Sequence, residues 1–488
     1  MFAQLLLCLR RFAGDTVCAV VCGLISGAAL AQEGGAVQTP SVSFPQAWEQ
    51  LQTQSHGLAA SAKAVEGTRL RREGMQGLGG PSVAITGMAY RYKAHVDMDL
   101  DPARHSLDGV LGQLPPVLGG VTGQLPQLPS HYSLQRSDSR ASASLSLLWP
   151  LYLGGAAEAV RGGLDAQTDE ALADARGDAL ALHRLLVERY FGAQLAQRAA
   201  QLRQQALDAV RQHDAAAQKM LQAGVLSEVE RLQARAALAD VQQQASQARD
   251  LAQLAATALA RTLQAAGPFA ISSPLFVGSQ PLPPLQHFLG LAQQHHPGLA
   301  KVRAKRGQAG ALHDTQEALR KPQVLGFGMR EVNTQGKPSW VVGVAARWTL
   351  WDSIDRDRLA AASQRSMEQA ELTEQQARSD IALLVEKNWL AVEHARQLYL
   401  SQQAQQELAQ ALLRLRQAGL REGTATTLEL MDAELNLAKV GTERAQTANQ
   451  YVQSLAELLQ ACGQSEDFVR YQAQADILIP TDTTITPP

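Results

Sequence analysis

The feature that most constrains the fold of this chain is an internal duplication, because a repeated sequence is expected to fold twice into the same unit. Displacing the sequence by 199 residues, the distance from Trp149 to Trp348, brings the two halves into register without a gap. The matched pairs are Trp149 with Trp348, Leu151 with Leu350, Leu185 with Leu384, Tyr190 with Trp389, Leu221 with Leu420, Gly224 with Gly423, Ser227 with Thr426, Ala234 with Ala433 and Leu238 with Leu437. Upstream the displacement becomes 241 residues, as for Gly57 and Gly298, because the first copy carries a longer insertion.

Each copy is predicted to run helix, strand, loop, strand, long helix, turn, helix. The chain is divided into a signal peptide at 1–31, a first repeat at 32–263, a linker at 264–283, a second repeat at 284–462 and a C-terminal tail at 463–488. In the first repeat we expect strands at about 82–94 and 139–152 and a helical hairpin at 154–263 with its tip near Gly224. In the second we expect strands at about 323–332 and 339–351 and a helical hairpin at 353–462 with its tip near Gly423.

The N-terminus is typical of a secretory signal. Arg10 and Arg11 precede an apolar run at 17–30, and small residues at 29 and 31 offer a cleavage site. This pattern indicates export to the periplasm. The alternative is an N-terminal membrane anchor, although the run is short for a spanning helix. After cleavage only Cys462 remains of the four cysteines, and we interpret it as a small apolar residue on a helix.

The second strand of each copy alternates between apolar and polar side chains. One apolar face consists of Ala141, Ala143, Leu145, Leu147, Trp149 and Leu151, and the other of Trp340, Val342, Val344, Ala346, Trp348 and Leu350. About ten residues of this alternation is the pattern of a barrel strand that faces lipid. A membrane aromatic girdle is therefore assigned to Trp149, Tyr152, Trp340, Trp348 and Trp351. A half-buried strand of a soluble sandwich produces the same alternation, so this alternative stays open.

Both hairpins begin with a helix free of strong breakers for about 65 residues, on the order of 100 Å at 1.5 Å per residue. Apolar residues in the first of them step by four and three, as in the series Leu195, Ala199, Leu202, Ala206 and Ala209. Such spacing predicts a coiled-coil seam, and alanine at seam positions permits a close approach of the helices. The fold class is therefore mainly α with a transmembrane β part.

The number of strands needed to close a β-barrel predicts the number of chains in the oligomer. An open four-stranded sheet in lipid leaves unpaired backbone groups that cost several kcal/mol each. Eight strands from two chains enclose only side chains, whereas twelve strands from three chains are the first number here expected to leave a pore. We therefore expect a homotrimer with a twelve-stranded β-barrel on an α-helical barrel.

Enzymatic and nucleic-acid functions find little support in the sequence. A phosphate-binding loop, a dinucleotide glycine motif and an HExxH zinc motif are all missing. The 11 histidines are scattered, and the net charge of −2 exerts no general attraction on nucleic acid. We predict neither a catalytic residue, nor a metal site, nor a cofactor.

The arrangement resembles the TolC-like outer-membrane efflux protein family over roughly residues 43–462. The resemblance rests on the duplicated Trp-x-Leu strand exits at Trp149 and Trp348, on Tyr190 and Trp389 in the long helices, and on the tips. The tip residues are Gly224, Val225, Leu226 and Ser227 in one copy and Gly423, Thr424, Ala425 and Thr426 in the other. The resemblance implies a trimeric exit duct in outer-membrane lipid. The duct would dock through its tips to a periplasmic adaptor that serves an inner-membrane pump. Of the tip residues, docking is assigned to Gly224, Val225, Leu226, Ser227, Gly423, Thr424 and Thr426.

The resemblance also implies a narrow entrance ringed by acidic residues after the second tip. Carried over by position, these are Glu429 and Asp432, with Glu230 as the first-copy equivalent of Glu429. Threefold symmetry would bring their carboxylates into one ring that favours cations. The alternative is that they are solvated charges. Ala425 and Leu420 stand where the family places an Arg and a Tyr to lock the closed entrance, which puts that lock in doubt here.

Three functions are consistent with these patterns. The first is efflux of small molecules such as drugs and toxic compounds in a tripartite system, and the second is type I protein secretion, which uses the same kind of duct. The third is a soluble periplasmic coiled-coil adaptor or structural protein. The exported substrate and the class of pump cannot be inferred from the sequence.

Overall fold

The computed structural model describes residues 41–102, 105–106, 131–224, 227–265, 269–332, 339–351, 353–479 and 484–485. The expected signal peptide, most of the loop between the first two strands, Val225, Leu226 and the second-copy loop at 333–338 lie outside this part.

The two copies repeat the same order of elements, and equivalent long helices have equal lengths. The first copy consists of α1 (Phe44–Gln54), α2 (His56–Gly74), β2 (Ser82–Asp99), β3 (His131–Tyr152), α5 (Ala156–Gln222) and α6 (Glu228–Thr262). The second consists of α7 (Leu285–His295), α8 (Pro297–Ala318), β6 (Gln323–Val332), β7 (Trp340–Arg347), α9 (Arg356–Glu422) and α10 (Thr427–Ala461). Helices α5 and α9 both have 67 residues, and α6 and α10 both have 35.

A break between two helices recurs at the same place in both copies. Ser55 separates α1 from α2, and His296 separates α7 from α8, at the upstream offset of 241 residues. In each case the side chain caps the second helix: Ser55 Oγ accepts from the Leu58 N–H at 3.3 Å and His296 Nδ1 from the Gly298 N–H at 3.0 Å. The caps satisfy orphan N–H groups at both breaks.

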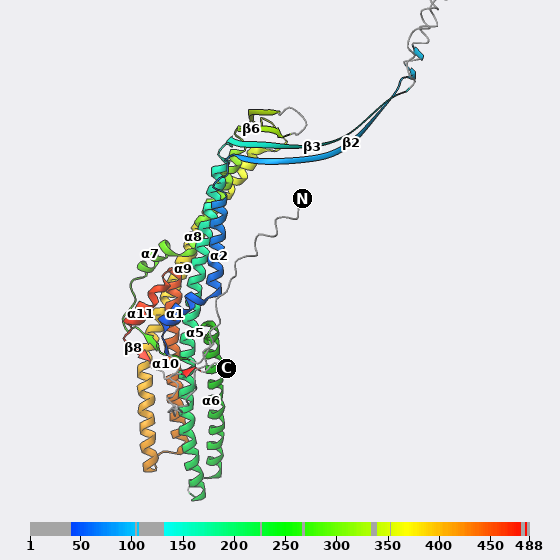
Figure 1. Cartoon of the computed structure of the whole chain (residues 1–488). Helices are drawn as coiled ribbons and strands as arrows, with labels where there is room; N and C mark the ends of the chain where they lie inside the picture. Colours follow the sequence, from blue (N-terminus) through cyan, green and yellow to red (C-terminus); the bar gives the residue numbers. More distant parts are fainter. Residues whose placement is uncertain are drawn as a thin grey trace, which may run out of the picture. The chain divides into compact units, whose positions relative to one another are not determined.

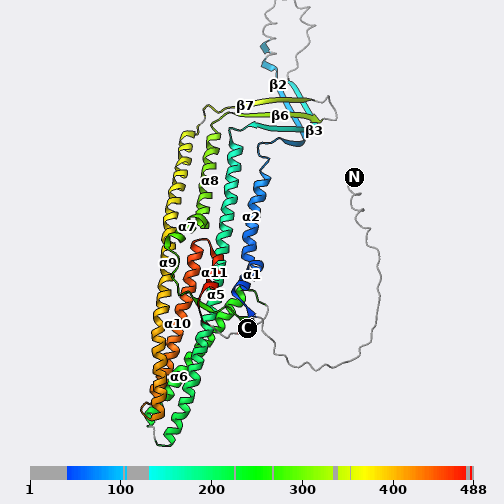
Figure 2. The same cartoon turned by 90° about the vertical axis from the view of Figure 1, so that its left-hand side faces the viewer.

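Helices α2, α5, α8 and α9 lie side by side in that order (Figure 2). Glycine and alanine allow α5 and α8 to approach closely, since a Cβ atom on Gly307 would lie 3.1 Å from Cβ of Ala166. Basic residues of α8 pair with acidic residues on both neighbours: Lys301 Nζ lies 2.8 Å from Asp174 Oδ1 of α5, and Arg303 Nε lies 3.7 Å from Glu374 Oε1 of α9. Hydrogen bonds and charge from Arg378 and Arg306 lower the pKa of the Glu374 carboxyl.

Toward the hairpin tips the neighbours change to the order α6, α5, α10, α9 (Figure 1). A cluster of small and medium apolar side chains joins α5, α6 and α10 there, and it consists of Leu207, Val210, Ala217, Ala234, Val241, Ala245 and Met431. Alanine at the seams keeps these helices close together, as the sequence predicts. Helix α9 stays at one edge of the layer throughout.

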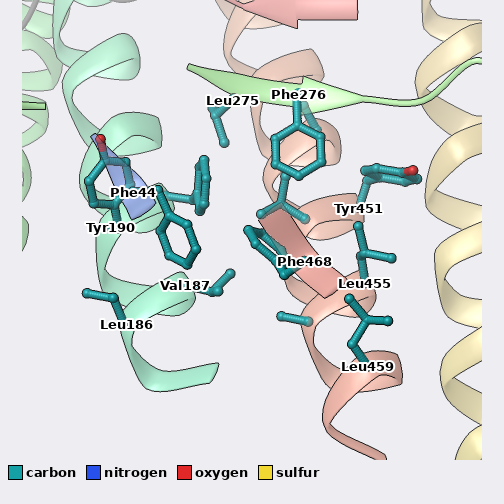
Figure 3. Close-up of a cluster of buried hydrophobic side chains, with 14 of the residues drawn as sticks. Phe44, Leu186, Val187, Tyr190, Leu275, Phe276, Tyr451, Leu455, Leu459 and Phe468 are labelled. Carbon is teal, nitrogen blue, oxygen red and sulfur yellow. The ribbon is translucent and has the colours of Figure 1, made fainter. Parts of the chain in front are cut away.

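The largest core is aromatic and joins both copies (Figure 3). Its buried side chains include Phe44, Leu186, Val187, Tyr190, Leu275, Phe276, Tyr451, Leu455, Leu459 and Phe468. The hydroxyl of Tyr190 donates to the Val42 carbonyl at 2.8 Å and accepts from the Ser273 N–H at 3.0 Å. Burial raises the pKa of the nearby Cys462 thiol to about 12, so this cysteine stays protonated and acts as a packing residue.

The segments expected as linker and tail are built into this core. The linker segment contributes β4 (Phe269–Ile271) and β5 (Leu275–Val277). The tail segment contributes a 3₁₀ turn η2 (Ser465–Asp467), α11 (Phe468–Gln474), β8 (Ile477–Ile479) and β9 (Thr484–Ile485). Strand β4 pairs with β1 (Ser41–Val42) and β9, and β5 pairs with β8. Three-residue strands carry no periodic signal, so the sequence pattern does not reveal them.

The remaining four strands form one antiparallel sheet in the order β2-β3-β6-β7. Strands β2 and β3 are longer than predicted, because residues 82–99 pair with 131–148, and in the added part the apolar side chains, such as Val96 and Met98, lie on the side of the sheet opposite to that of Leu145. Strand β7 is shorter than predicted and ends at Arg347, because its partner β6 begins opposite at Gln323. None of the helices in the described ranges offers a stretch long and apolar enough to cross a membrane.

The buried His183 makes the stability of the aromatic core sensitive to acid. Its ring is 1% exposed and lies against Trp48, Phe44 and Phe468, at ring-centroid distances of 4.7, 5.5 and 5.8 Å. Burial lowers its pKa to about 4, whereas an unfolded chain would protonate it near its ordinary value of 6.5. The unfolded state therefore binds one more proton between these values, and stability falls as the pH falls through this window.

We expect His183→Phe to remove this loss. Over the window from about pH 6.5 to 4 the loss amounts to roughly 3 kcal/mol. Thermal unfolding of the detergent-solubilised protein at pH 7.5 and pH 4.5, followed by circular dichroism, should show a smaller acid shift for His183→Phe than for the parent. The control is His56→Phe, which changes an exposed histidine. An equal acid shift in all three proteins would contradict the prediction.

Candidate functional site

One face of the four-stranded sheet is apolar across all its strands. Cross-strand partners share a face, so the register places together Val83 and Ile85 of β2, Leu145, Leu147 and Trp149 of β3, and Trp340, Val342 and Val344 of β7. Ile85 is 79% exposed and Val342 is 73% exposed. An apolar surface of this extent needs a cover of lipid or protein. We call it the apolar face.

Strand β6 contributes glycine to the apolar face, and its own large side chains point the other way. Gly326 and Gly328 lie opposite Trp149 and Leu147, whereas Leu325, Phe327 and Met329 lie on the other side of the sheet. Neighbours fill the space above the glycines, since a Cβ atom on Gly328 would lie 3.7 Å from Cγ2 of Val342. The apolar face is therefore continuous from β3 to β7.

The five aromatic residues assigned to a girdle are all exposed. Trp149 and Tyr152 lie in β3 next to α5, and Trp340 lies at the opposite end of the sheet, where β7 begins. Trp348 and Trp351 come after β7 ends, and the indole Nε1 of Trp348 donates to the Arg320 carbonyl at 3.2 Å. Aromatic rings thus lie at both ends of the apolar face. This is the distribution that a membrane-facing sheet needs.

The two hairpin tips are built alike. Gly224 and Gly423 both adopt a left-handed backbone, with φ of 75° and 74°, which only glycine adopts without strain. Ser227 and Thr426 begin the returning helices, and each forms a capping box with a glutamate three residues later. The Ser227 N–H donates to Glu230 Oε2 at 2.9 Å, and the Thr426 N–H to Glu429 Oε2 at 3.0 Å. Of the other expected docking residues, Val225 and Leu226 lie outside the described residues, and the Thr424 N–H donates to the Gly419 carbonyl at 2.8 Å.

The capping boxes give Glu230 and Glu429 a structural role that the sequence reasoning did not assign to them. Hydrogen bonds from Ser227 lower the pKa of the Glu230 carboxyl. Glu429 Oε2 also lies 3.3 Å from Nη1 of Arg416 on α9, which offsets its charge. Asp432 is exposed and forms no ion pair within the described part of the chain. Of the three expected constriction residues, Asp432 is therefore the one whose charge is least compensated.

The ion pair between Arg231 and Asp214 of the first hairpin has no equivalent in the second. Arg231 of α6 binds Asp214 of α5 through two contacts, one of them from Nη2 to Oδ2 at 3.2 Å, and its Nε donates to Gln218 Oε1 at 2.7 Å. The two side chains are only 11% and 16% exposed. Leu430 and Leu413 occupy the equivalent positions in the second copy, at the offset of 199 residues. A comparison of the two copies at this offset would have revealed that a charged pair in the first copy is replaced by a leucine pair in the second.

Leucine side chains on α9 form a second exposed apolar surface. Leu372, Leu383, Leu390, Leu408 and Leu415 are each more than half exposed. Their separations of 11, 7, 18 and 7 residues are close to whole helical turns, so the five lie on one stripe. Val229, Leu232, Leu251 and Leu254 of α6, at the opposite edge of the layer, are also more than half exposed. Both edges of the helical layer thus present leucine to the outside.

In the described ranges His, Cys, Asp and Glu side chains form no group able to hold a metal ion. Several open grooves lie among the described residues, some along helix seams and others beside strand ends and turns. One of them is lined by Gly154, Gly162, Gly307, Asp314 and Lys321.

Known proteins match the chain by sequence profile and by fold. The profile of the family described as outer membrane efflux protein matches residues 47–264 and 288–464. The fold is similar to CusC, with a TM-score of 0.71, 14% identity and coverage of 89% of this chain and 95% of that one. It is also similar to the Campylobacter jejuni CmeC outer membrane channel (TM-score 0.70, 13% identity, coverage 93% and 98%) and to the open state of the Neisseria gonorrhoeae MtrE outer membrane channel (0.69, 15%, 86% and 89%). No curated protein sequence matches the chain.

We expect Asp214→Leu to loosen the first hairpin, because it leaves Arg231 buried without a counter-charge. Breaking a buried pair in this way costs roughly 3–5 kcal/mol. The double variant Asp214→Leu/Arg231→Leu reproduces the leucine pair of the second copy and should recover most of the loss. Hydrogen exchange of residues 205–245 measures the effect, and α9 and α10 serve as the internal reference. Equal exchange in the single and double variants would show that the pair is not what stabilises this hairpin.

Proposed function

The chain belongs to the outer membrane efflux protein family, and from that premise we propose that it is one protomer of a ring-shaped duct that crosses the outer membrane and extends into the periplasm. Members of this family are efflux channels of the bacterial outer membrane and not enzymes. Family membership therefore also sets aside a soluble adaptor. We propose in addition the number of protomers, the partners, the exported substrate and the residues of the pore.

Open edges on two opposite sides of the protomer support a ring. The sheet ends in β2 on one side and β7 on the other, and each edge strand has a row of backbone groups without a strand partner in the described sheet. The helical layer ends on the same two sides, with α2 and α6 following the β2 side and α9 the β7 side. Two different edges that complement each other generate a head-to-tail interface, and such an interface closes into a ring when the rotation between neighbouring chains completes a circle.

Three is the smallest number of protomers whose strands would close into a barrel with an open passage. Three copies of the four-stranded sheet give twelve strands, whereas eight strands enclose only side chains. The apolar face would then contact outer-membrane lipid, with its aromatic ends at the headgroups. The exposed leucines of α9 would contact α6 or α2 of the next protomer. We therefore propose a homotrimeric β-barrel on a helical tunnel.

The hairpin tips are the proposed docking site for a periplasmic adaptor of an inner-membrane pump. Both tips are exposed turns held by their own capping boxes, so their shape does not depend on a partner. The proposed surface consists of Gly224, Val225, Leu226, Ser227, Gly423, Thr424 and Thr426. Small-molecule efflux in a tripartite system is the function we favour, because the family profile describes efflux proteins. Type I protein secretion would use the same duct.

Asp432 is the residue proposed to set the ion preference of the entrance, assisted by Glu429. Asp432 and Glu429 lie three residues apart at the start of α10, so they share a helix face. The contact with Arg416 reduces the contribution of Glu429. The same contact ties α9 to α10 near Leu420 and Ala425, where the family's usual lock residues are missing.

We expect Leu408→Glu/Leu415→Glu to prevent assembly, because it places two charges in the stripe that meets the next protomer. Burying a leucine contributes roughly 1.5–3 kcal/mol, and burying an unpaired charge is costly. Size-exclusion chromatography with light scattering in detergent should show single chains. The control is Gln403→Glu/Gln410→Glu, which has the same spacing and charge change and lies roughly 200° round α9. Trimers in both variants would contradict the proposed interface.

We expect Asp432→Asn to reduce the cation preference of the channel more than Glu429→Gln does. The reason is that the charge of Glu429 is already partly offset by Arg416. The reversal potential in planar bilayers under a KCl gradient measures the preference, and Glu230→Gln, the third residue expected at the constriction, is measured beside them. Unchanged selectivity in Asp432→Asn would show that this carboxylate does not line the narrow part, and the absence of any conductance in the parent would overturn the channel itself.

A further inference from the structure

Strands β2 and β3 continue past the point where the apolar face ends. The pairing of β3 with β6 stops at Ala143 and Val332, whereas β2 and β3 remain paired as far as Asp99 and His131. On the side of the apolar face the last small or apolar pairs are Gly87 with Ala143 and Ala89 with Ala141. Beyond them the same side of the two-stranded ribbon carries only polar and charged residues.

The first side chains beyond this boundary are cations. Arg91 and Lys93 follow Ala89 at intervals of two, so the pleat places both on the side of the apolar face. Both are exposed, and their cross-strand neighbours are the neutral residues Ser139 and Ser137. Neither forms an ion pair with another residue of the described chain. Their charges are therefore available to a partner outside the protomer.

A third cation lies at the same end of the sheet. Arg330 of β6 pairs across the strands with Trp340 of β7 and Leu145 of β3, which places it on the apolar face. Arg330 is exposed, and Trp340 is 75% exposed. Only Val332 follows Arg330 on this face of β6, and Trp340 beside it is of a residue type enriched at the headgroup level of membranes.

The nearby carboxylates are engaged elsewhere or lie on the other side. Asp97, the first carboxylate beyond Lys93 on this side, binds His95 at 2.8 Å from Oδ2 to Nε2. Glu331 lies on the opposite side of β6 and accepts from Ser339 Oγ at 3.0 Å. The boundary of the apolar face therefore carries a local positive charge, although the chain as a whole has a net charge of −2.

We propose that Arg91, Lys93 and Arg330 bind the phosphate headgroups of anionic lipid in the leaflet farther from the hairpins. Arg91 lies about 7 Å along the strand beyond Ala89, and the headgroup layer extends roughly 5–8 Å beyond the hydrocarbon. A guanidinium group matches a phosphate through two parallel N–H donors. Three protomers would place nine such cations around the barrel. The inference rests on the proposed membrane channel and adds the lipid that surrounds it.

The full-length protein, reconstituted in phosphatidylcholine vesicles, allows a direct test. Spin-labelled phosphatidylglycerol and spin-labelled phosphatidylcholine report, by electron spin resonance, the ratio of their association constants with the protein. We expect the parent to prefer phosphatidylglycerol and Arg91→Ser/Arg330→Ser to lose most of this preference, with Lys93→Ser removing the remainder. Each cation contributes about fivefold at its own contact at low ionic strength, and added salt weakens the effect.

The matched control is Arg136→Ser/Arg347→Ser. It also removes two exposed arginines from two strands, but Arg136 and Arg347 lie on the other side of the sheet. The control should keep the preference of the parent. A parent without preference for phosphatidylglycerol, or an equal loss in both double variants, would overturn the proposal. Conductance of the same proteins in planar bilayers separates the two levels: conducting channels without a lipid preference contradict only the headgroup contact, whereas proteins that do not conduct contradict the proposed function.

Discussion

Backbone pairing at the sheet edges is the constraint on which the rest of the structure depends. Strand β2 and strand β7 each have one row of N–H and C=O groups without a strand partner in the part of the sheet that the structure describes. In lipid each unpaired group costs several kcal/mol, so the edges of neighbouring chains have to meet. The helices follow the same geometry, because each strand continues directly into a helix of the adjacent layer. The leucine stripe on α9 is thus the helical counterpart of the open edge of β7.

The sequence predicts those parts of the structure whose apolar side chains repeat with a helical or strand period. The offset of 199 residues and the helical spacing were sufficient to predict both long hairpins, their tips and the four-stranded sheet. The far half of the ribbon was missed, because its apolar side chains, such as Val96 and Met98, change to the other side of the sheet and so interrupt the pattern of the first half. The contact of Glu429 with Arg416 was also missed, since it depends on how α9 and α10 pack at the tip. The assignment of Asp432 to the pore stays a prediction, because the narrow part would form only between neighbouring chains.

The two copies share a backbone plan and differ in how each hairpin is held together. In the first copy the bidentate Arg231–Asp214 pair joins α5 to α6, and in the second Leu430 and Leu413 occupy these positions. An ion pair specifies one relative position of two helices, because both charges must remain paired. Apolar contacts tolerate a small slide with little loss of buried area. The second hairpin has an ion pair of its own near the tip, between Arg416 and Glu429, so the copies keep the same fold while the contacts that join each hairpin differ.

The aromatic core that fastens both hairpins at one level has a mechanical consequence. Tyr190 precedes Gly224 by 34 residues, and its second-copy equivalent Trp389 precedes Gly423 by the same number. Between that level and its tip, each hairpin extends for roughly 50 Å. A tilt of one degree at the core therefore displaces a tip by about 1 Å, from the arm length alone. The strands from the linker and tail segments pack at this level, so a small rotation of a hairpin about Phe276 and Phe468 becomes a larger displacement at its tip.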